Sequence, residues 1–380
     1  MKSLGNIAFD YVTLLCVILP FHLCMQVYIA EISSVKLRGI FGTLTQIMLT
    51  SGVVVNYAVG AIDDFPYCYI SLVAVGIVAL FEVLMIWLPE TPRWLLSRGY
   101  GEDAEKVLLW LRGKKIGVQQ ELDEMKKAIT TSKAKRTKVQ KEFLKRSVFV
   151  PFIYVLTAFF FHQAGGINAV SSFASSLFTE AGISDPRTTS IYAVGGASLI
   201  GNCASFITVD LVGRTSLLIF SGTGTFLGSA MLGIHFFITR PSLCDSVNST
   251  LVESVDVVES CNTHFGPLAI VSLILYRFAF YIGWIPIPWL LLSELLPLAV
   301  RGVASGFAMF TTWSVAAVVA GFYLQYTELV QPWFAMWTFS LVNLASVLFV
   351  LVFIPETKGK TLEEMERRFE RRPNVVETIL

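Results

Sequence analysis

Charged side chains are scarce in this 380-residue sequence: Asp, Glu, Lys and Arg together make up 15% of it, whereas hydrophobic residues make up 54%. A water-soluble protein of this length needs more polar surface to cover its core. The six cysteines show no metal-ligand spacing, and the sequence contains neither a phosphate-binding glycine-rich loop nor a catalytic triad. We therefore expect no metal, no cofactor, no enzyme activity and no nucleotide-driven pump.

Long apolar runs are abundant instead. A run of about 20 residues is long enough to cross the hydrocarbon core of a bilayer as a helix. No small-residue cleavage site follows the first run, so we interpret it as a membrane span and not as a signal peptide. The predicted fold class is therefore an all-α polytopic membrane protein. Nine spans are predicted, at about 7–27, 40–61, 67–88, 149–178, 188–212, 216–238, 267–292, 303–325 and 331–354.

Positive charge is distributed unevenly among the connections between these spans. One alternating set holds 25 of the 29 Lys and Arg residues, whereas the opposite set holds only Arg187 and Arg240. Because Lys and Arg concentrate on the cytoplasmic side of membrane proteins, the first set is predicted to be cytoplasmic. This cytoplasmic set comprises 31–39, 89–148, 213–215, 294–301 and the tail from 355.

The longest outward connection, 239–266, has features typical of an oxidising compartment. Asn248 begins an Asn-Ser-Thr sequon and is a predicted N-glycosylation acceptor. Cys244 and Cys261 lie in the same loop, where a disulfide between them and two free cysteines are both compatible with the sequence.

Two charged elbows reveal an internal repeat. Glu31 is followed seven residues later by Arg38, and Glu294 is followed seven residues later by Arg301. A Pro-Glu-Thr run follows each elbow at nearly the same distance, at 89–91 and 355–357. The repeat predicts two homologous halves of six spans each, and the count places three of those twelve spans before residue 1. The predicted domains are an incomplete N-terminal bundle at 1–88, a cytoplasmic helical linker at 89–148, a six-helix C-terminal bundle at 149–354 and a cytoplasmic tail at 355–380.

The linker is the only sizeable polar segment. Its stretches Ala104–Leu111 and Gln119–Ile129 carry apolar residues at helical spacing, which predicts amphipathic helices. Lys133–Arg146 is strongly basic. We interpret this run as a solvated segment beside the anionic leaflet of the bilayer, and not as a nucleic-acid-binding site.

A set of short motifs in a fixed order extends over most of the chain. They are Val27–Glu31, Leu37–Gly39, Pro89–Leu95, Gly166–Val170, Asp210–Arg214, Pro286–Trp289 and Pro355–Gly359. With these motifs the sequence resembles the sugar-porter family of the major facilitator superfamily, which includes the facilitative glucose transporters. The long loop before the span at 267–292, together with Gly283-Trp284, is most similar to the class III glucose transporters and the trehalose-transporter-like group. The resemblance implies the major facilitator fold, with about nine of its twelve helices present.

The resemblance also implies the residues of a sugar site near the middle of the membrane. A sugar needs hydrogen-bonding side chains for its hydroxyls and an aromatic surface for its apolar ring faces. His162 stands where the family often has a glutamine, and Thr312 where it often has an asparagine. The implied substrate-binding residues are Gln46, His162, Gln163, Asn168, Trp289 and Thr312.

Two helices in this region are predicted to be interrupted. The pair Gly165-Gly166 permits a local break that would aim Gln163 and Asn168 into one place. Pro286 and Pro288 each remove a backbone donor and are predicted to bend or break the helix before Trp289. Ser198 stands at another position that the family often fills with an amide. Arg277 lies inside a span, where an arginine is by default a functional-site hypothesis; we expect its side chain to extend toward the outer interface instead.

A second group of residues implied by the resemblance is an inner gate of charges. These would bridge the two bundles while the site faces outward and separate when it opens inward. Individually weak, partly exposed ion pairs suit such a latch. The gate residues are Glu31, Arg38, Glu90, Arg93, Asp210, Arg214, Glu294, Arg301 and Glu356.

The function that the resemblance implies is facilitated diffusion of a hexose or small disaccharide by alternating access. One alternative is a non-transporting sugar sensor or an inactive truncated isoform, and another is a proton-coupled sugar symporter. The expected partners are a sugar and the lipid bilayer, in either the plasma membrane or an endolysosomal membrane. The sequence assigns no oligomeric state.

Overall fold

We describe a computed structural model of the chain for residues 28–29, 31–33, 38–62, 67–113, 118–136, 143–239, 257–360 and 362–370. Every regular element in these ranges is a helix. The first predicted span, 7–27, falls outside them.

The helices follow one another in a simple order. The N-terminal part contains α2 (Arg38–Gly60), α3 (Tyr67–Ile86), α4 (Pro92–Arg98), α5 (Gly101–Arg112) and α6 (Val118–Arg136). The middle contains α8 (Arg146–Ala164), α9 (Ile167–Ser172), α10 (Ala174–Glu180), α11 (Pro186–Ser190), the π-helix η1 (Ile191–Gly196), α12 (Ala197–Val212) and α13 (Arg214–Ile238). The last part contains α15 (Val257–Gly283), α16 (Ile287–Leu295), α17 (Leu298–Val330), α18 (Pro332–Phe353) and α19 (Leu362–Glu370).

Membrane-spanning length and composition recur along the described chain. Eight of the nine predicted spans coincide with these helices, and six of the eight form long apolar stretches. The six are Arg146–Ser172, Pro186–Val209, Arg214–Ile238, Phe265–Leu295, Val300–Val330 and Pro332–Phe353. Helices α2 and α3 contribute the shorter apolar stretches Leu44–Gly60 and Val75–Ile86.

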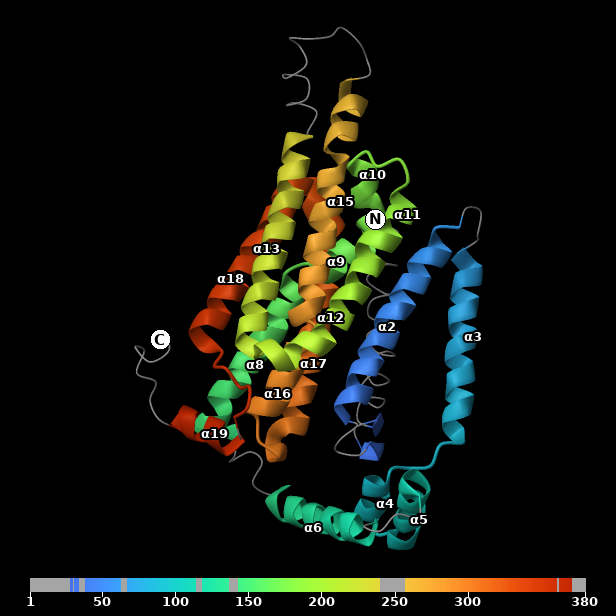
Figure 1. The fold of residues 1–380 in the computed structure, drawn as a ribbon, viewed down its shortest axis with the longest axis vertical. Helices are drawn as coiled ribbons and strands as arrows, with labels where there is room; N and C mark the ends of the chain where they lie inside the picture. Colours follow the sequence, from blue (N-terminus) through green and yellow to red (C-terminus); the bar gives the residue numbers. More distant parts are fainter. Residues whose placement is uncertain are drawn as a thin grey trace.

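The helices of the C-terminal half form one packed bundle (Figure 1). In it, α13 lies between α15 and α18, α12 packs on α15, and α8 packs on α17. The close approach of α13 to α15 depends on Gly228, because a Cβ at that position would lie 2.7 Å from the backbone nitrogen of Tyr276. Helix α2 contacts this bundle along α12 and η1, and α3 lies beyond α2.

The polar linker folds into a small helical unit. Figure 1 shows α4, α5 and α6 gathered at one end of the molecule, the end near which α19 also lies. The two predicted amphipathic stretches fall within α5 and α6, and they bury Leu108 and Leu122 against each other's helices. Arg112 binds Glu121 with two hydrogen bonds, of 3.0 and 3.2 Å, and also donates to the carbonyl of Ile32 at 2.9 Å. The linker is thereby attached to the first elbow.

Both predicted helix interruptions are confirmed. Helix α8 ends at Ala164 and α9 begins at Ile167, with Gly166 between them at a φ of 88°. Helix α15 ends at Gly283, and α16 begins at Ile287 directly after Pro286. The two breaks position the residues of the candidate site described next.

Candidate functional site

The two amides that flank the glycine break bind each other. Asn168 Nδ2 donates to Gln163 Oε1 at 2.7 Å, and the Gln163 side chain is buried, with 5% of its surface exposed. In an uninterrupted helix two residues five positions apart would point about 140° away from each other. The break therefore produces the convergence that the sequence predicted.

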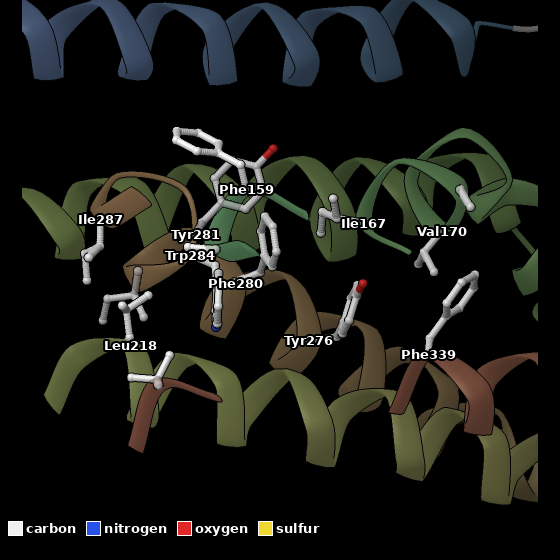
Figure 2. Close-up of a cluster of buried hydrophobic side chains, with 14 of the residues drawn as sticks. Phe159, Ile167, Val170, Leu218, Tyr276, Phe280, Tyr281, Trp284, Ile287 and Phe339 are labelled. Carbon is white, nitrogen blue, oxygen red and sulfur yellow. The ribbon is translucent and has the colours of Figure 1, made fainter. Parts of the chain in front are cut away.

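Side chains of α18 and α15 pack closely against the α8–α9 break and hold it in place. A Cβ on Gly166 would lie 2.7 Å from the ring of Phe339, and a Cβ on Gly165 would lie 2.3 Å from Asn343 Oδ1. The carbonyl of Gly165, which the break frees from helix bonding, accepts the hydroxyl of Tyr276 at 2.8 Å. Figure 2 shows Tyr276 and Phe339 beside the segment that carries Ile167 and Val170.

His162 lies next to the amide pair in an aromatic environment. Its ring centroid lies 5.3 Å from that of Phe280 and 6.3 Å from that of Phe159. Only 6% of its surface is exposed, and neither ring nitrogen has a hydrogen-bond partner among the described residues. His162, which directly precedes Gln163 in the chain, therefore carries two polar ring atoms without a described partner.

Trp289 joins the proline break to the same aromatic group. It lies on α16, and its ring packs edge-to-face on Phe159 at a centroid distance of 4.6 Å. Phe159 thus contacts both Trp289 and His162. Aromatic surface next to two amides is the combination that recognises a sugar ring, whose faces are apolar and whose edge carries hydroxyls.

Gln46 and Thr312 have different surroundings. The backbone carbonyl of Gln46 on α2 accepts the Asn202 amide at 3.0 Å, and the same amide donates to Thr50 Oγ1 at 2.8 Å. The Thr312 hydroxyl donates to the carbonyl of Ala308 in its own helix at 2.7 Å. The described hydrogen bonds do not connect either residue to the amide pair.

Sequence reasoning missed two intramembrane amides and misjudged one cation. Asn202 links α12 to α2, and Asn343 packs on Gly165; a lone amide inside an apolar span was the available signal for both.

The expectation that Arg277 extends to the outer interface is wrong, because only 1% of its surface is exposed. It stays buried because oxygens of neighbouring helices, including Ser198 Oγ at 3.0 Å, accept its hydrogen bonds.

Charged residues of the second half that are predicted to belong to the inner gate form a connected network. Arg214 pairs with Glu294 at 2.9 Å, and the Thr357 hydroxyl donates to the other carboxylate oxygen of Glu294. The Glu356 carboxylate accepts the backbone N–H groups of Arg214, Thr215, Thr357 and Lys358, at 2.9 to 3.0 Å. Burial raises the pKa of Glu356, but these four N–H groups outweigh it and hold the pKa below its ordinary value.

The first half repeats part of this network. The Thr91 hydroxyl donates to Glu31 at 2.5 Å, so the threonine of each Pro-Glu-Thr run binds the glutamate of its own elbow. Among the other predicted gate residues, Glu90 and Arg93 of the first half are exposed. Arg301 of the second half donates to the carbonyl of Leu296 at 3.0 Å. The structure does not describe the side chains of Arg38, Asp210 and Cys261. Cys244 and Asn248 lie outside the described residues altogether. The disulfide and the glycosylation stay predictions.

Comparison with known proteins agrees with this architecture. The model of the family described as "Sugar (and other) transporter" matches residues 21–369. Solute carrier family 2, facilitated glucose transporter member 8 of Bos taurus is 32% identical over 92% of this chain and 71% of its own length. The facilitated trehalose transporter Tret1 of Apis mellifera ligustica is 31% identical over 91% of this chain and 65% of its own.

Solved structures show the same fold. The proton:xylose symporter XylE bound to 6-bromo-6-deoxy-D-glucose is 28% identical, with a TM-score of 0.66, over 91% of this chain and 70% of that one. The inward-open xylose transporter XylE from E. coli is 25% identical, with a TM-score of 0.68. Family match, identity and fold agree: this chain belongs to the sugar transporter family of the major facilitator superfamily, a family of transporters and not of enzymes.

Proposed function

We propose that this chain carries out facilitated diffusion of a hexose or a small disaccharide by alternating access, with the substrate bound beside Gln163, Asn168 and Trp289. The observation that carries the proposal is the 2.7 Å bond between Asn168 and Gln163 across the glycine break. It brings two amides together in a buried part of the bundle, next to the aromatic group of Phe159 and Trp289. His162, Gln46 and Thr312 complete the proposed set of substrate-binding residues.

The amide pair suits weak, reversible binding. Asn168 already donates to Gln163, so a sugar that binds to these amides must replace this bond. Sugar hydroxyls exchange that bond for new ones of similar strength, and the net gain is small. We therefore expect millimolar affinity, roughly −4 kcal/mol, which allows the fast release that transport requires.

The charged residues at the predicted cytoplasmic end are proposed to form the inner gate. Arg214 and Glu294 are partly exposed, with side-chain exposures of 13% and 25%. Partly exposed pairs of this kind contribute about 0–1 kcal/mol each, so thermal motion can open them. The described pairs of Glu294 and Glu356 lie within the second half, where they attach the elbow and the tail to the start of α13.

Uniport is the mode that we propose, with proton symport as the alternative. The two curated relatives above are named facilitated transporters, whereas XylE is named a proton symporter. Within the six long described spans, the carboxylates Glu294 and Glu328 lie near span ends. A proton-coupling acid would need a position deeper in the membrane. A proton ionophore that abolishes uptake would favour the symporter.

Sugar uptake by the expressed chain tests the proposal. In Gln163→Ala and Trp289→Ala we expect uptake to fall at least about tenfold, because each loses a direct substrate contact. Gln120→Ala, an exposed position on α6, is the matched control and should leave uptake unchanged. Wild-type uptake in both site variants would refute the proposal. Sugar-induced thermal stabilisation without uptake would favour a sensor.

A further inference from the structure

Arg277 is a buried cation surrounded by neutral oxygen acceptors. Its Nε donates to Ser198 Oγ at 3.0 Å, and one terminal nitrogen donates to Tyr281 Oη at 3.2 Å. The other terminal nitrogen donates to Ser171 Oγ and, at 3.5 Å, to the carbonyl of Ile167. A guanidinium at this depth is costly compared with an apolar side chain, which points to a task that an apolar side chain cannot perform.

Two of the acceptors of Arg277 lie on α9, one on each side of Asn168 in the sequence. Ile167 directly precedes Asn168, and Ser171 lies three residues after it, so the guanidinium spans the turn that carries this amide. The preceding residue of α15, Tyr276, binds the Gly165 carbonyl at 2.8 Å. Two consecutive residues of α15 therefore hold the chain on both sides of Gly166.

Ser171 also connects this turn to the N-terminal half. Its backbone carbonyl accepts the hydroxyl of Tyr57 from α2, while its side chain accepts the Arg277 bond. Ser198, the acceptor of the Nε bond, lies on α12, the helix that α2 packs against. The guanidinium is thus the point at which α9, α12 and α15 meet beside the contact with α2.

We propose that Arg277 is a positioning residue for the sugar site: its forked hydrogen bonds fix the α9 turn and so hold Asn168 against Gln163. The inference rests on the proposed function, because it assumes that this amide pair binds sugar. Charge alone is not sufficient, since a lysine ammonium is a point donor and cannot reach Ser198, Ser171 and Tyr281 with fixed geometry. Arg277→Lys is therefore expected to resemble Arg277→Gln.

A double-mutant cycle on uptake by the full chain tests this role. We expect Arg277→Gln to raise the KM for sugar about tenfold, as the amide pair loses its alignment. Asn168→Ala should raise the KM as well, and the double variant should be no worse than Asn168→Ala, because Arg277 acts through Asn168. Arg98→Gln, at an exposed arginine on α4, is the matched control.

The cycle also separates this inference from the proposed function. KM losses that multiply in the double variant, or a wild-type KM in Arg277→Gln, would overturn the positioning role alone. A wild-type KM in Asn168→Ala would overturn the proposed function and the inference with it. If Arg277→Gln does not fold, Ser171→Ala removes one acceptor only; its expected KM rise of about threefold must disappear in the Asn168→Ala background.

Discussion

The two breaks in the C-terminal half interrupt their helices by different means. At the α8–α9 break, Gly166 takes up a left-handed conformation, and the helix on each side presents an amide. At the α15–α16 break, Pro286 and Pro288 lack N–H donors, and the neighbouring side chains Trp284 and Trp289 are aromatic. The two breaks are in contact, because Trp289 on one side packs against Phe159 on the other.

The difference separates two tasks that a sugar site must combine. A glycine break turns the backbone sharply and lets another helix approach closely, so side chains five residues apart can converge. A proline break removes backbone N–H donors and adds an apolar ring. Both changes are compatible with an aromatic surface beside the break. In the proposed site, polar recognition thus belongs to the glycine break and ring stacking to the proline break.

Gly166→Ala gives the largest expected effect. At a φ of 88° an L-residue costs about 1–2 kcal/mol, and the new Cβ would lie 2.7 Å from the Phe339 ring. We expect a lower melting temperature of the purified protein and the loss of uptake. Gly306→Ala is the control, because it lies inside α17 with open space around it. Normal uptake in Gly166→Ala would show that the left-handed turn is not required.

Gly165→Ala should cost somewhat less, and its loss should be recoverable. Gly165 has a φ of −66°, so only the contact of the new Cβ with Asn343 Oδ1 opposes the substitution. We expect a destabilisation of about 1–3 kcal/mol, typical of overpacking. Adding Asn343→Ala should restore most of the melting temperature. If the double variant is as unstable as the single one, steric overlap is not the cause.

Pro286→Ala examines the proline break. Alanine restores an N–H and lets α15 continue toward α16, which would displace Trp289 from Phe159. We expect a melting temperature that is unchanged or higher, with maximal uptake lowered about threefold. Pro332→Ala is the control, since Pro332 begins α18, where proline is ordinarily tolerated. A fall in stability without a fall in uptake would contradict this view.

The smallest effect should distinguish the two tryptophans. Trp289→Phe keeps an aromatic ring against Phe159 but removes the indole N–H, so we expect the KM to rise about twofold. Trp284 Nε1 has no hydrogen-bond partner among the described residues, and the side chain is buried. Trp284→Phe should lower the melting temperature, because the smaller ring leaves a cavity, and should leave the KM unchanged. Equal KM shifts in both variants would remove the distinction.

Both breaks could be predicted from the sequence because glycine and proline act on the backbone locally. The convergence of Gln163 and Asn168 followed from their spacing around Gly165 and Gly166 together with the family resemblance. The repeat of the elbows was likewise visible in the sequence, and the matching bonds from Thr91 and Thr357 agree with it.

The surroundings of Arg277, Asn202 and Asn343 could not be predicted. Their partners lie 79, 156 and 114 residues away in the chain, on helices whose neighbours no local pattern identifies. The burial of Arg277 depends on acceptors from two other segments, α9 and α12, together with Tyr281 of its own helix, whereas the cost of an intramembrane arginine alone favours a position at the outer interface.

Glu356 is synthesised well after the helix whose N-terminus it caps. It caps the N–H groups of Arg214 and Thr215, which precede it by 142 and 141 residues. At a translation rate of roughly 5–20 residues per second, the first turn of α13 exists for on the order of ten seconds before its cap has been made. Water at the membrane surface can solvate those donors in the interval. The first turn of α13 is therefore capped only after the intervening helices have been made, by a segment that leaves the ribosome after them.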